Sequence, residues 1–151
     1  MKIATKHFGH VEVDETKLLK FHNGLPGFEM YKTYALIPVD ESAVYFALQS
    51  VEAAGVALIV SSPYIFFKGY VFNVDEDTKQ ELGLTSPDDV LVYNVLTLRE
   101  PFKDSTMNLQ APVIINVKNR KSKQLILNDQ SYQTRHLLVN GQEGGGSRVN
   151  P

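Results

Sequence analysis

The side chains best suited to form a binding surface are the aromatic ones between residues 61 and 72. Five of the fifteen Phe and Tyr residues of the chain fall in this stretch. Exposed aromatic side chains ringed by polar groups are common anchors of protein–protein interfaces. Phe66 and Phe67 are adjacent, so on an extended backbone one of them points outward. We therefore predict that Tyr64, Phe66, Phe67 and Tyr70 bind a protein partner, with a two-sided core segment as the alternative.

A second set of candidate side chains is acidic. Asp75, Glu76 and Asp77 could serve as catalytic carboxylates or hold a cation. The same residues suit the first turn of a helix, because negative charge there interacts favourably with the helix dipole. Asp75 can cap that turn, and Gly83 suits the position just past the helix end. The sequence therefore favours one short helix near residues 75–82 over a catalytic or metal site.

The sequence shows no motif of a known class of enzyme. The sequence contains no P-loop, dinucleotide fingerprint, G-x-S-x-G elbow or H-E-x-x-H motif. It has no Cys, which excludes a thiolate zinc site and a cysteine nucleophile. A small hydrolase built on His22 or His136 stays open, although neither has a visible nucleophile nearby. We expect no enzyme, no cofactor and no metal site.

The overall charge argues against direct nucleic-acid binding. The net charge is −2 and the isoelectric point is about 6.1, whereas nucleic-acid-binding domains usually carry a basic excess. Residues 118–123 contain four cations, which fit the solvated tip of a hairpin. A β-barrel RNA-binding module that uses this tip and the aromatic residues is the alternative function.

The longest regular pattern runs through residues 107–117. Every odd position is apolar and most even positions are polar, which predicts a half-buried β-strand. Pro112 removes a ladder donor, so the strand is at an edge or bulged there. Its polar face, Asn108, Gln110 and Asn116, is the second candidate surface for a protein partner, because side-chain amides there could contact it.

The remaining pattern is of short strands separated by turns. Asn23-Gly24 and Pro26-Gly27 are turn dipeptides, and the second suits a type II turn. Further strands are predicted over residues 34–39, 44–51, 56–60, 90–98 and 124–127. The fold class is therefore all-β, mainly antiparallel, in a small barrel-like or sandwich domain with one short helix.

The domain organisation is simple. Residues 1–139 are predicted to form a single β domain, and residues 140–151, which contain a Gly144-Gly-Gly-Ser run, a flexible tail. The N-terminus lacks an apolar signal sequence, and no apolar run approaches the roughly 18 residues of a membrane helix. We expect a cytoplasmic protein that does not bind membranes.

Several of these segments, taken together and in order, resemble the FliW family of bacterial flagellar assembly factors. The resemblance runs from about residue 8 to residue 135. Its main stretches are Phe21-His-Asn-Gly-Leu-Pro-Gly-Phe28, Leu48-Gln-Ser50, Ala57-Leu-Ile-Val60 with Pro63 and Phe66-Phe67, Asn108-Leu-Gln-Ala-Pro-Val-Ile-Ile-Asn116, and Gln124-Leu-Ile-Leu127 with Tyr132.

The resemblance implies a non-enzymatic regulator with two protein partners. Members of this family bind flagellin, and they bind and antagonise the RNA-binding translational regulator CsrA by a non-competitive route. Flagellin translation is thereby coupled to the flagellin level. The resemblance implies no particular contact residues, so the surfaces above remain physical predictions. Beside a basic RNA-binding partner, Asp75, Glu76 and Asp77 would disfavour the approach of RNA.

Overall fold

The structure, a computed structural model, describes residues 1–139, so the predicted tail over residues 140–151 lies outside the described part. The strands are β1 (Lys2–Ala4), β2 (His10–Glu12), β3 (Leu19–Phe21), β4 (Thr33–Pro38), β5 (Tyr45–Ser50), β6 (Ala57–Ser61), β7 (Val90–Thr97), β8 (Thr106–Met107), β9 (Val113–Asn116), β10 (Lys121–Gln124) and β11 (His136–Leu137). The helices are α1 (Pro63–Phe66) and α2 (Glu76–Leu82), with short 3-10 turns η1 (Glu15–Lys17), η2 (Pro87–Asp89) and η3 (Phe102–Asp104).

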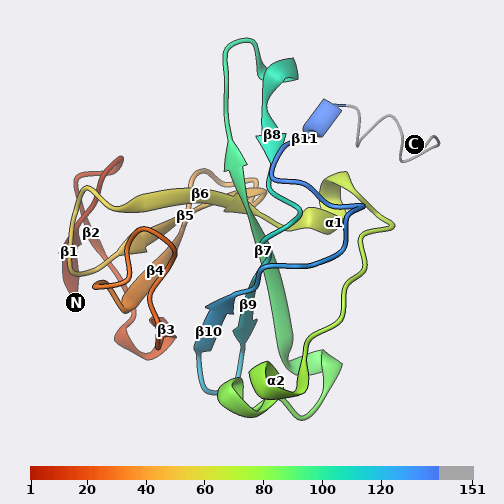
Figure 1. Cartoon of the computed structure of the whole chain (residues 1–151). Coiled ribbons are helices and arrows are strands. Elements are labelled where there is room, and N and C mark those ends of the chain that lie inside the picture. The colour runs from red at the N-terminus through yellow and green to blue at the C-terminus, as the bar shows by residue number, and fades with distance from the viewer. Residues whose placement is uncertain (140–151) are drawn as a thin grey trace.

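Seven strands close into a barrel. Neighbouring strands follow the order β7, β6, β5, β4, β3, β10 and β9, and β9 pairs again with β7 (Figure 1). Every pairing in this ring is antiparallel except that of β3 with β10. The predicted all-β, mainly antiparallel fold class is therefore confirmed, and of its two alternatives the structure is the barrel and not the sandwich.

The alternation predicted one strand over residues 107–117, but the structure divides this run between two strands. It forms β8 and β9, which both pair with β7. Met107 and Val113 are six residues apart, whereas their partners on β7, Leu96 and Tyr93, are three apart. The extra residues form a bulge that contains Pro112, in agreement with the bulge expected there.

Strand β9 is buried on both faces because it lies between two apolar clusters. Val113 and Ile115 belong to a cluster that also contains residues of β3, β4, β5 and β6, so this cluster fills the barrel. Ile114 belongs to a second cluster that includes residues of α1, α2 and the C-terminal segment. The prediction that one face of this strand points to solvent is therefore wrong.

Helix α2 is the predicted helix. The Asp75 side chain accepts hydrogen bonds from the backbone amide and the hydroxyl of Thr78, at 3.3 Å and 2.6 Å. Gly83 ends the helix in the left-handed conformation, with φ +69°, which glycine adopts without steric cost. Local capping signals therefore located this helix correctly.

Helix α1 replaces the extended segment expected at residues 63–66. It is a single turn with Ser62 at the N-cap and Pro63 in the first turn. The same Ser-Pro pair begins the turn η2, which has Ser86 at its N-cap and Pro87 in its first turn. The extended-backbone argument for Phe66 and Phe67 therefore does not hold.

The predicted turns between β3 and β4 are present. The Phe28 amide donates to the Leu25 carbonyl at 2.8 Å, and Gly27 between them has φ +85°, as a type II turn requires. Gly24 has φ +66°, and a Cβ atom there would lie 2.7 Å from the backbone of Glu29. A side chain at Gly24 would therefore collide with the loop itself.

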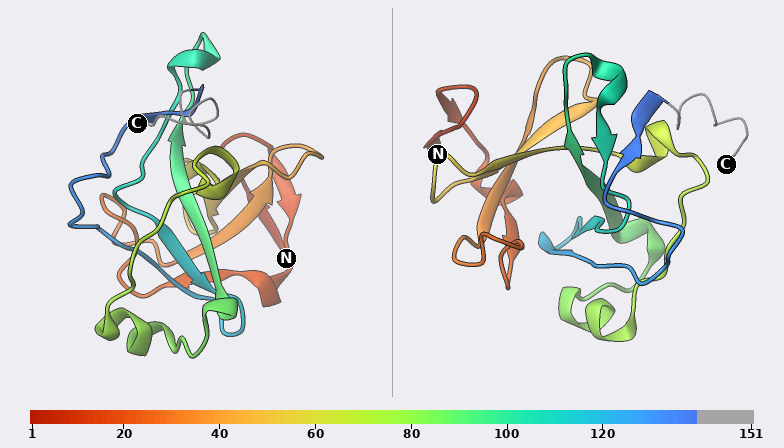
Figure 2. Two further views of the ribbon diagram at one scale, coloured as in Figure 1. Left: turned by 90° about the vertical axis from the view of Figure 1, so that its right-hand side faces the viewer. Right: turned by 45° about the horizontal axis from the view of Figure 1, so that its top comes forward.

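The elements outside the barrel lie on different sides of it. The β1–β2 hairpin packs on the outer face of β4 through a small cluster that includes Ile3, Leu18 and Ala35. Helix α1 and strand β11 lie on the side away from this hairpin, and α2 lies near the lower end of β7 (Figure 2). Among residues 1–139, no helix is both long enough and apolar enough to cross a membrane.

Candidate functional site

The predicted aromatic surface is divided between the core and the exterior. Phe66 and Tyr70 are only 2% and 3% exposed. The Tyr70 hydroxyl donates to the Leu109 carbonyl at 2.6 Å and accepts from the Asn94 amide at 3.3 Å. Burial raises the pKa of Tyr70 to about 12. The prediction that Phe66 and Tyr70 contact a partner is therefore wrong, because both are core residues.

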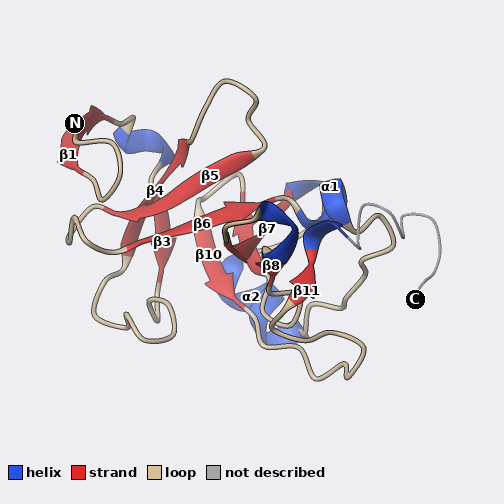
Figure 3. Ribbon diagram, turned by 90° about the horizontal axis from the view of Figure 1, so that it is seen from above, coloured by secondary structure: helices blue, strands red, loops and turns tan. Residues whose placement is uncertain are grey.

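Tyr64 does reach the surface, beside apolar residues that the sequence reasoning missed. Tyr64 and Ile65 on α1 are 42% and 45% exposed, and Val71 and Leu137 are exposed as well. We call these four residues the α1 surface. Strand β11, which carries Leu137, lies close to α1 (Figure 3). Recognising Ser62-Pro63 as a helix start would have shown that residues 63–66 do not alternate between two faces as a strand does.

Half-buried rings beneath the α1 surface hold its parts together. The Phe67 ring meets the His136 ring edge-on at 6.0 Å, which links α1 to β11. Tyr132 packs against Tyr70 at 4.8 Å, and its hydroxyl accepts from the Val71 amide at 3.1 Å. These contacts give the exposed side chains a fixed backbone, which reduces the entropy lost when a partner binds.

His136 is neutral in this setting. Its Nε2 atom accepts a hydrogen bond from the Gln133 amide at 2.8 Å, and an imidazolium could not accept that bond. Burial lowers the pKa of His136 from its ordinary value of 6.5. Within residues 1–139, neither His136 nor His22 has a hydroxyl as a hydrogen-bond partner, so no nucleophile–base pair supports the hydrolase alternative.

The side-chain amides predicted to face a partner along residues 107–117 make hydrogen bonds within the fold instead. Asn116 is 2% exposed, and its amide donates to the Leu82 and Gly83 carbonyls at the end of α2, at 2.8 Å and 3.3 Å. The Asn108 side chain accepts from the Gln110 and Ala111 amides within the bulge. Asn116 is therefore not a partner contact, and Asn108 and Gln110 are half-buried.

The acidic residues at the start of α2 are exposed. Asp75 caps the helix, and the hydrogen bond from the Thr78 hydroxyl lowers the pKa of its carboxyl group. Glu76 pairs with Lys79 at 3.4 Å, and Asp77 points to solvent. No group of three His, Asp or Glu residues in the described part of the chain could hold a metal ion.

The hairpin over residues 118–123 is partly neutralised. Lys118 lies 3.4 Å from Asp89, and Lys123 lies 3.0 Å from Glu81 of α2. Each of these ion pairs removes a cation from the set available to phosphate. An RNA-binding function that depends on this tip therefore loses part of its electrostatic support.

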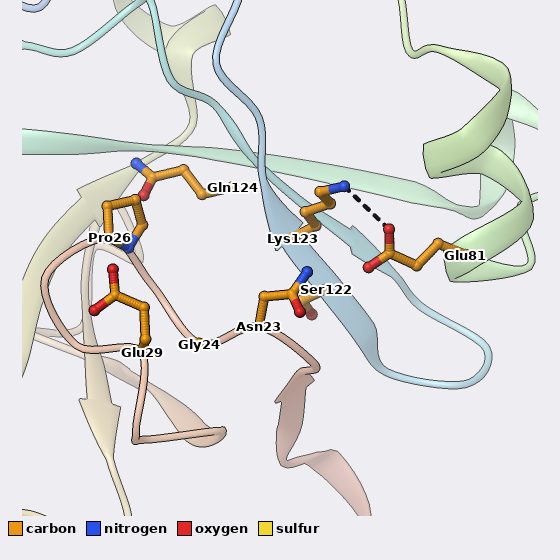
Figure 4. Close-up of a pocket in the computed structure, with 8 residues that line it drawn as sticks. All are labelled: Asn23, Gly24, Pro26, Glu29, Glu81, Ser122, Lys123 and Gln124. Carbon is orange, nitrogen blue, oxygen red and sulfur yellow. Dashed lines mark hydrogen bonds and ion pairs between the residues drawn. The ribbon is translucent and has the colours of Figure 1, made fainter.

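One pocket of about 260 Å³ lies beside this hairpin (Figure 4). The Glu81–Lys123 ion pair lies on one side, and the loop that carries Glu29 lies on the other. Most of the residues that line it have polar side chains, although most of the lining surface is apolar: Asn23, Gly24, Pro26, Glu29, Glu81, Ser122, Lys123 and Gln124. No His is among these residues, so the pocket offers hydrogen-bonding groups without a general base of ordinary pKa near 7.

Known proteins resemble this chain over almost its whole length. The model of a family described as "FliW protein" matches residues 2–138. A flagellar assembly factor FliW from Bacillus velezensis is 46% identical over 97% of this chain and 99% of its own length. The one from Bacillus subtilis (strain 168) is 44% identical over 91% and 96%. A crystal structure of a flagellar assembly factor FliW superposes with a TM-score of 0.86 at 38% identity, over 91% of this chain and 96% of the other.

Proposed function

Because this chain belongs to the FliW family, we propose that it is a non-enzymatic regulator of flagellar assembly that acts in the cytoplasm. It binds flagellin, and it binds and antagonises CsrA without competing for the RNA-contacting surface. The level of free flagellin thereby controls flagellin translation. Relatives named as flagellar assembly factors support the general role, and the partners and the route are our proposal.

The observation that carries this proposal is the α1 surface. Tyr64 and Ile65 are exposed on one helical turn, and Val71 and Leu137 are exposed on the segment that follows α1 and on β11. Tyr is enriched among the residues that dominate binding energy, because its ring is large and its hydroxyl tolerates water. We propose that flagellin docks on this surface, since an apolar area on a rigid base suits a partner that is bound before it is assembled.

The acidic start of α2 supports the action on CsrA. Asp75, Glu76 and Asp77 are exposed, and among residues 1–139 Glu76 is the only one of the three within ion-pair distance of a cation. A basic RNA-binding protein is attracted to such a cluster, and RNA approaching the complex is repelled over about 8 Å at physiological ionic strength. The bound regulator therefore weakens RNA binding from beside the RNA site, which is a non-competitive route.

The first experiment measures flagellin affinity of the Tyr64→Ala/Ile65→Ser variant by calorimetry. We expect each truncation to cost about 1 kcal/mol or more, so the double variant binds at least about twenty-fold more weakly. Met30→Ala is the matched control, because Met30 is 72% exposed on a loop distant in sequence from the α1 surface. Wild-type affinity in the double variant, with an unchanged thermal transition, would remove the α1 surface from the proposal.

The second experiment neutralises the acidic cluster without uncapping the helix. Asn caps a helix as well as Asp does, so we choose Asp75→Asn/Glu76→Gln/Asp77→Asn. We expect the variant to release RNA from CsrA less effectively than the wild type at low salt, with a smaller difference at high salt. Equal antagonism at all salt concentrations would show that this cluster is not its cause.

A further inference from the structure

Two lysines face each other on the outside of the barrel. Lys20 of β3 and Lys121 of β10 are direct partners in the one parallel pairing of the barrel. Both side chains are exposed, while their neighbours Phe21 and Ser122 point inward. Like charges directly opposite one another on a sheet are destabilising. Within residues 1–139, neither lysine has a carboxylate within ion-pair distance.

A third cation is held at the same place in an unfavourable backbone conformation. Arg120 has φ +67°, in the left-handed region, which costs residues other than glycine free energy. Its carbonyl accepts the Lys20 amide at 2.9 Å, so β3 and the hairpin meet at this residue. We call Lys20, Arg120 and Lys121 the basic face. Glycine at position 120 would adopt this conformation without the steric cost. The presence of arginine there therefore suggests that its side chain has a role.

The base of this basic face is fixed. Asn119 donates from its side chain to the Leu82 carbonyl at 3.0 Å and accepts the Lys121 amide at 2.9 Å. Asn116 holds the same end of α2 from the buried side. The hairpin therefore presents its cations from a backbone tied to both β3 and α2, so little ordering is needed on binding.

We propose that the basic face docks an acidic segment of a protein partner. Within residues 1–139, none of these three cations lies within ion-pair distance of a carboxylate. The net charge of the protein is −2, so the positive charge is local and complementary to carboxylates. Single-stranded RNA is the less suitable occupant, because the face itself includes no aromatic side chain for a base to stack on. This surface differs from the α1 surface and the acidic cluster, so the inference goes beyond the proposed function.

The test uses a labelled octaglutamate peptide and a twelve-nucleotide oligouridine, with binding followed by fluorescence anisotropy at 20 mM and 500 mM salt. We expect the full chain to bind the peptide at low salt and to lose it at high salt. Lys20→Gln/Lys121→Gln should weaken binding by about five-fold, as expected for two exposed charge contacts. The matched control is Lys68→Gln/Lys103→Gln, which removes two exposed lysines elsewhere.

Three results would overturn the proposal. The first is no peptide binding at low salt, and the second is binding that the Lys20→Gln/Lys121→Gln variant and its control weaken equally. The third is oligouridine that binds more tightly than the peptide with the same dependence on Lys20 and Lys121, which would assign the face to nucleic acid. Neither result bears on flagellin binding at Tyr64, so failure here is distinguishable from failure of the proposed function.

A second variant separates charge from conformation. Arg120→Gly should raise the thermal transition, because it relieves the left-handed backbone, and should also weaken peptide binding. Ala43→Gly is its control, because Ala43 has φ +57° and carries no charge; it should raise the transition and leave binding unchanged. Unchanged peptide affinity in Arg120→Gly would remove this arginine from the face.

Discussion

The two helices that cover the barrel are fixed by different chemistry. Around α1, aromatic rings pack on one another, with Tyr70 at the centre between Tyr64 and Tyr132 at 6.0 Å and 4.8 Å. Around α2, the side-chain amides of Asn116 and Asn119 hold the carbonyls at the helix end. The first region therefore relies on ring packing and the second on hydrogen bonds.

This difference determines what each region has left for a partner. Ring packing buries Phe66 and Tyr70 and leaves an apolar rim that includes Tyr64 and Ile65. Amide bonding buries Asn116 and leaves charges of both signs on the surface around it. An apolar partner thus suits the α1 region, and charged partners suit the α2 region.

The largest expected effect breaks the amide anchor of α2. Asn116→Leu leaves two carbonyls and the Lys118 amide without this partner in a buried site, so we expect a loss of about 3 kcal/mol in the free energy of unfolding. Urea denaturation measures it. Asn119→Ala, at an exposed position, should cost about 1 kcal/mol. Equal losses in the two variants would mean that burial of the Asn116 amide adds nothing to its contribution to the free energy of unfolding.

A smaller effect tests the claim that rings rather than hydrogen bonds fix the α1 region. Tyr70→Phe keeps the ring and removes the donor to the Leu109 carbonyl, so we expect a loss of about 1–2 kcal/mol, below that of Asn116→Leu. Tyr64→Phe, whose side chain is exposed, should be nearly neutral. A loss in Tyr70→Phe as large as in Asn116→Leu would show that both helices depend equally on buried hydrogen bonds.

The smallest effect is a pH dependence confined to the α1 region. Because burial lowers the pKa of His136 in the folded protein, the unfolded chain binds its proton first as pH falls below 6.5. Stability should therefore decline from pH 6.5 downward to the folded pKa, with no further loss from this group below it. His136→Gln keeps an acceptor for the Gln133 amide and should flatten this decline in thermal melts. A decline of the same size in the variant would assign it to another group.

Signals that act within a few residues predicted their structures correctly. Asp75 and Gly83 marked the two ends of α2, Pro26-Gly27 marked its turn, and Pro112 marked the bulge. In each case the backbone preference of one residue decides the local conformation, so no distant contact has to be known. The regular spacing of such signals was also sufficient for the all-β fold class.

Predictions of exposure failed where a distant segment covers the residue. Asn116 lies on the polar phase of an alternating run, but the end of α2, more than 30 residues earlier, accepts its amide. Alternation assumes that one face of a strand meets water, and β9 has protein on both faces. Tyr70 is covered in the same way by Leu109 and Tyr132. Of these errors, only the extended backbone assumed for Phe66 could have been corrected locally, from the Ser62-Pro63 helix start.

The pairing of β3 with β10 has a consequence for how the chain folds. It joins Lys20 to Lys121, so the barrel stays open until most of the chain has been synthesised. Closing the loop between these two residues costs conformational entropy before the contacts that stabilise the barrel can form, and this slows folding. Until then β3 and β9, the two neighbours of β10, each present an unpaired edge on which another strand could pair wrongly. We expect the barrel to close late in folding, with β10 as the strand whose arrival completes it.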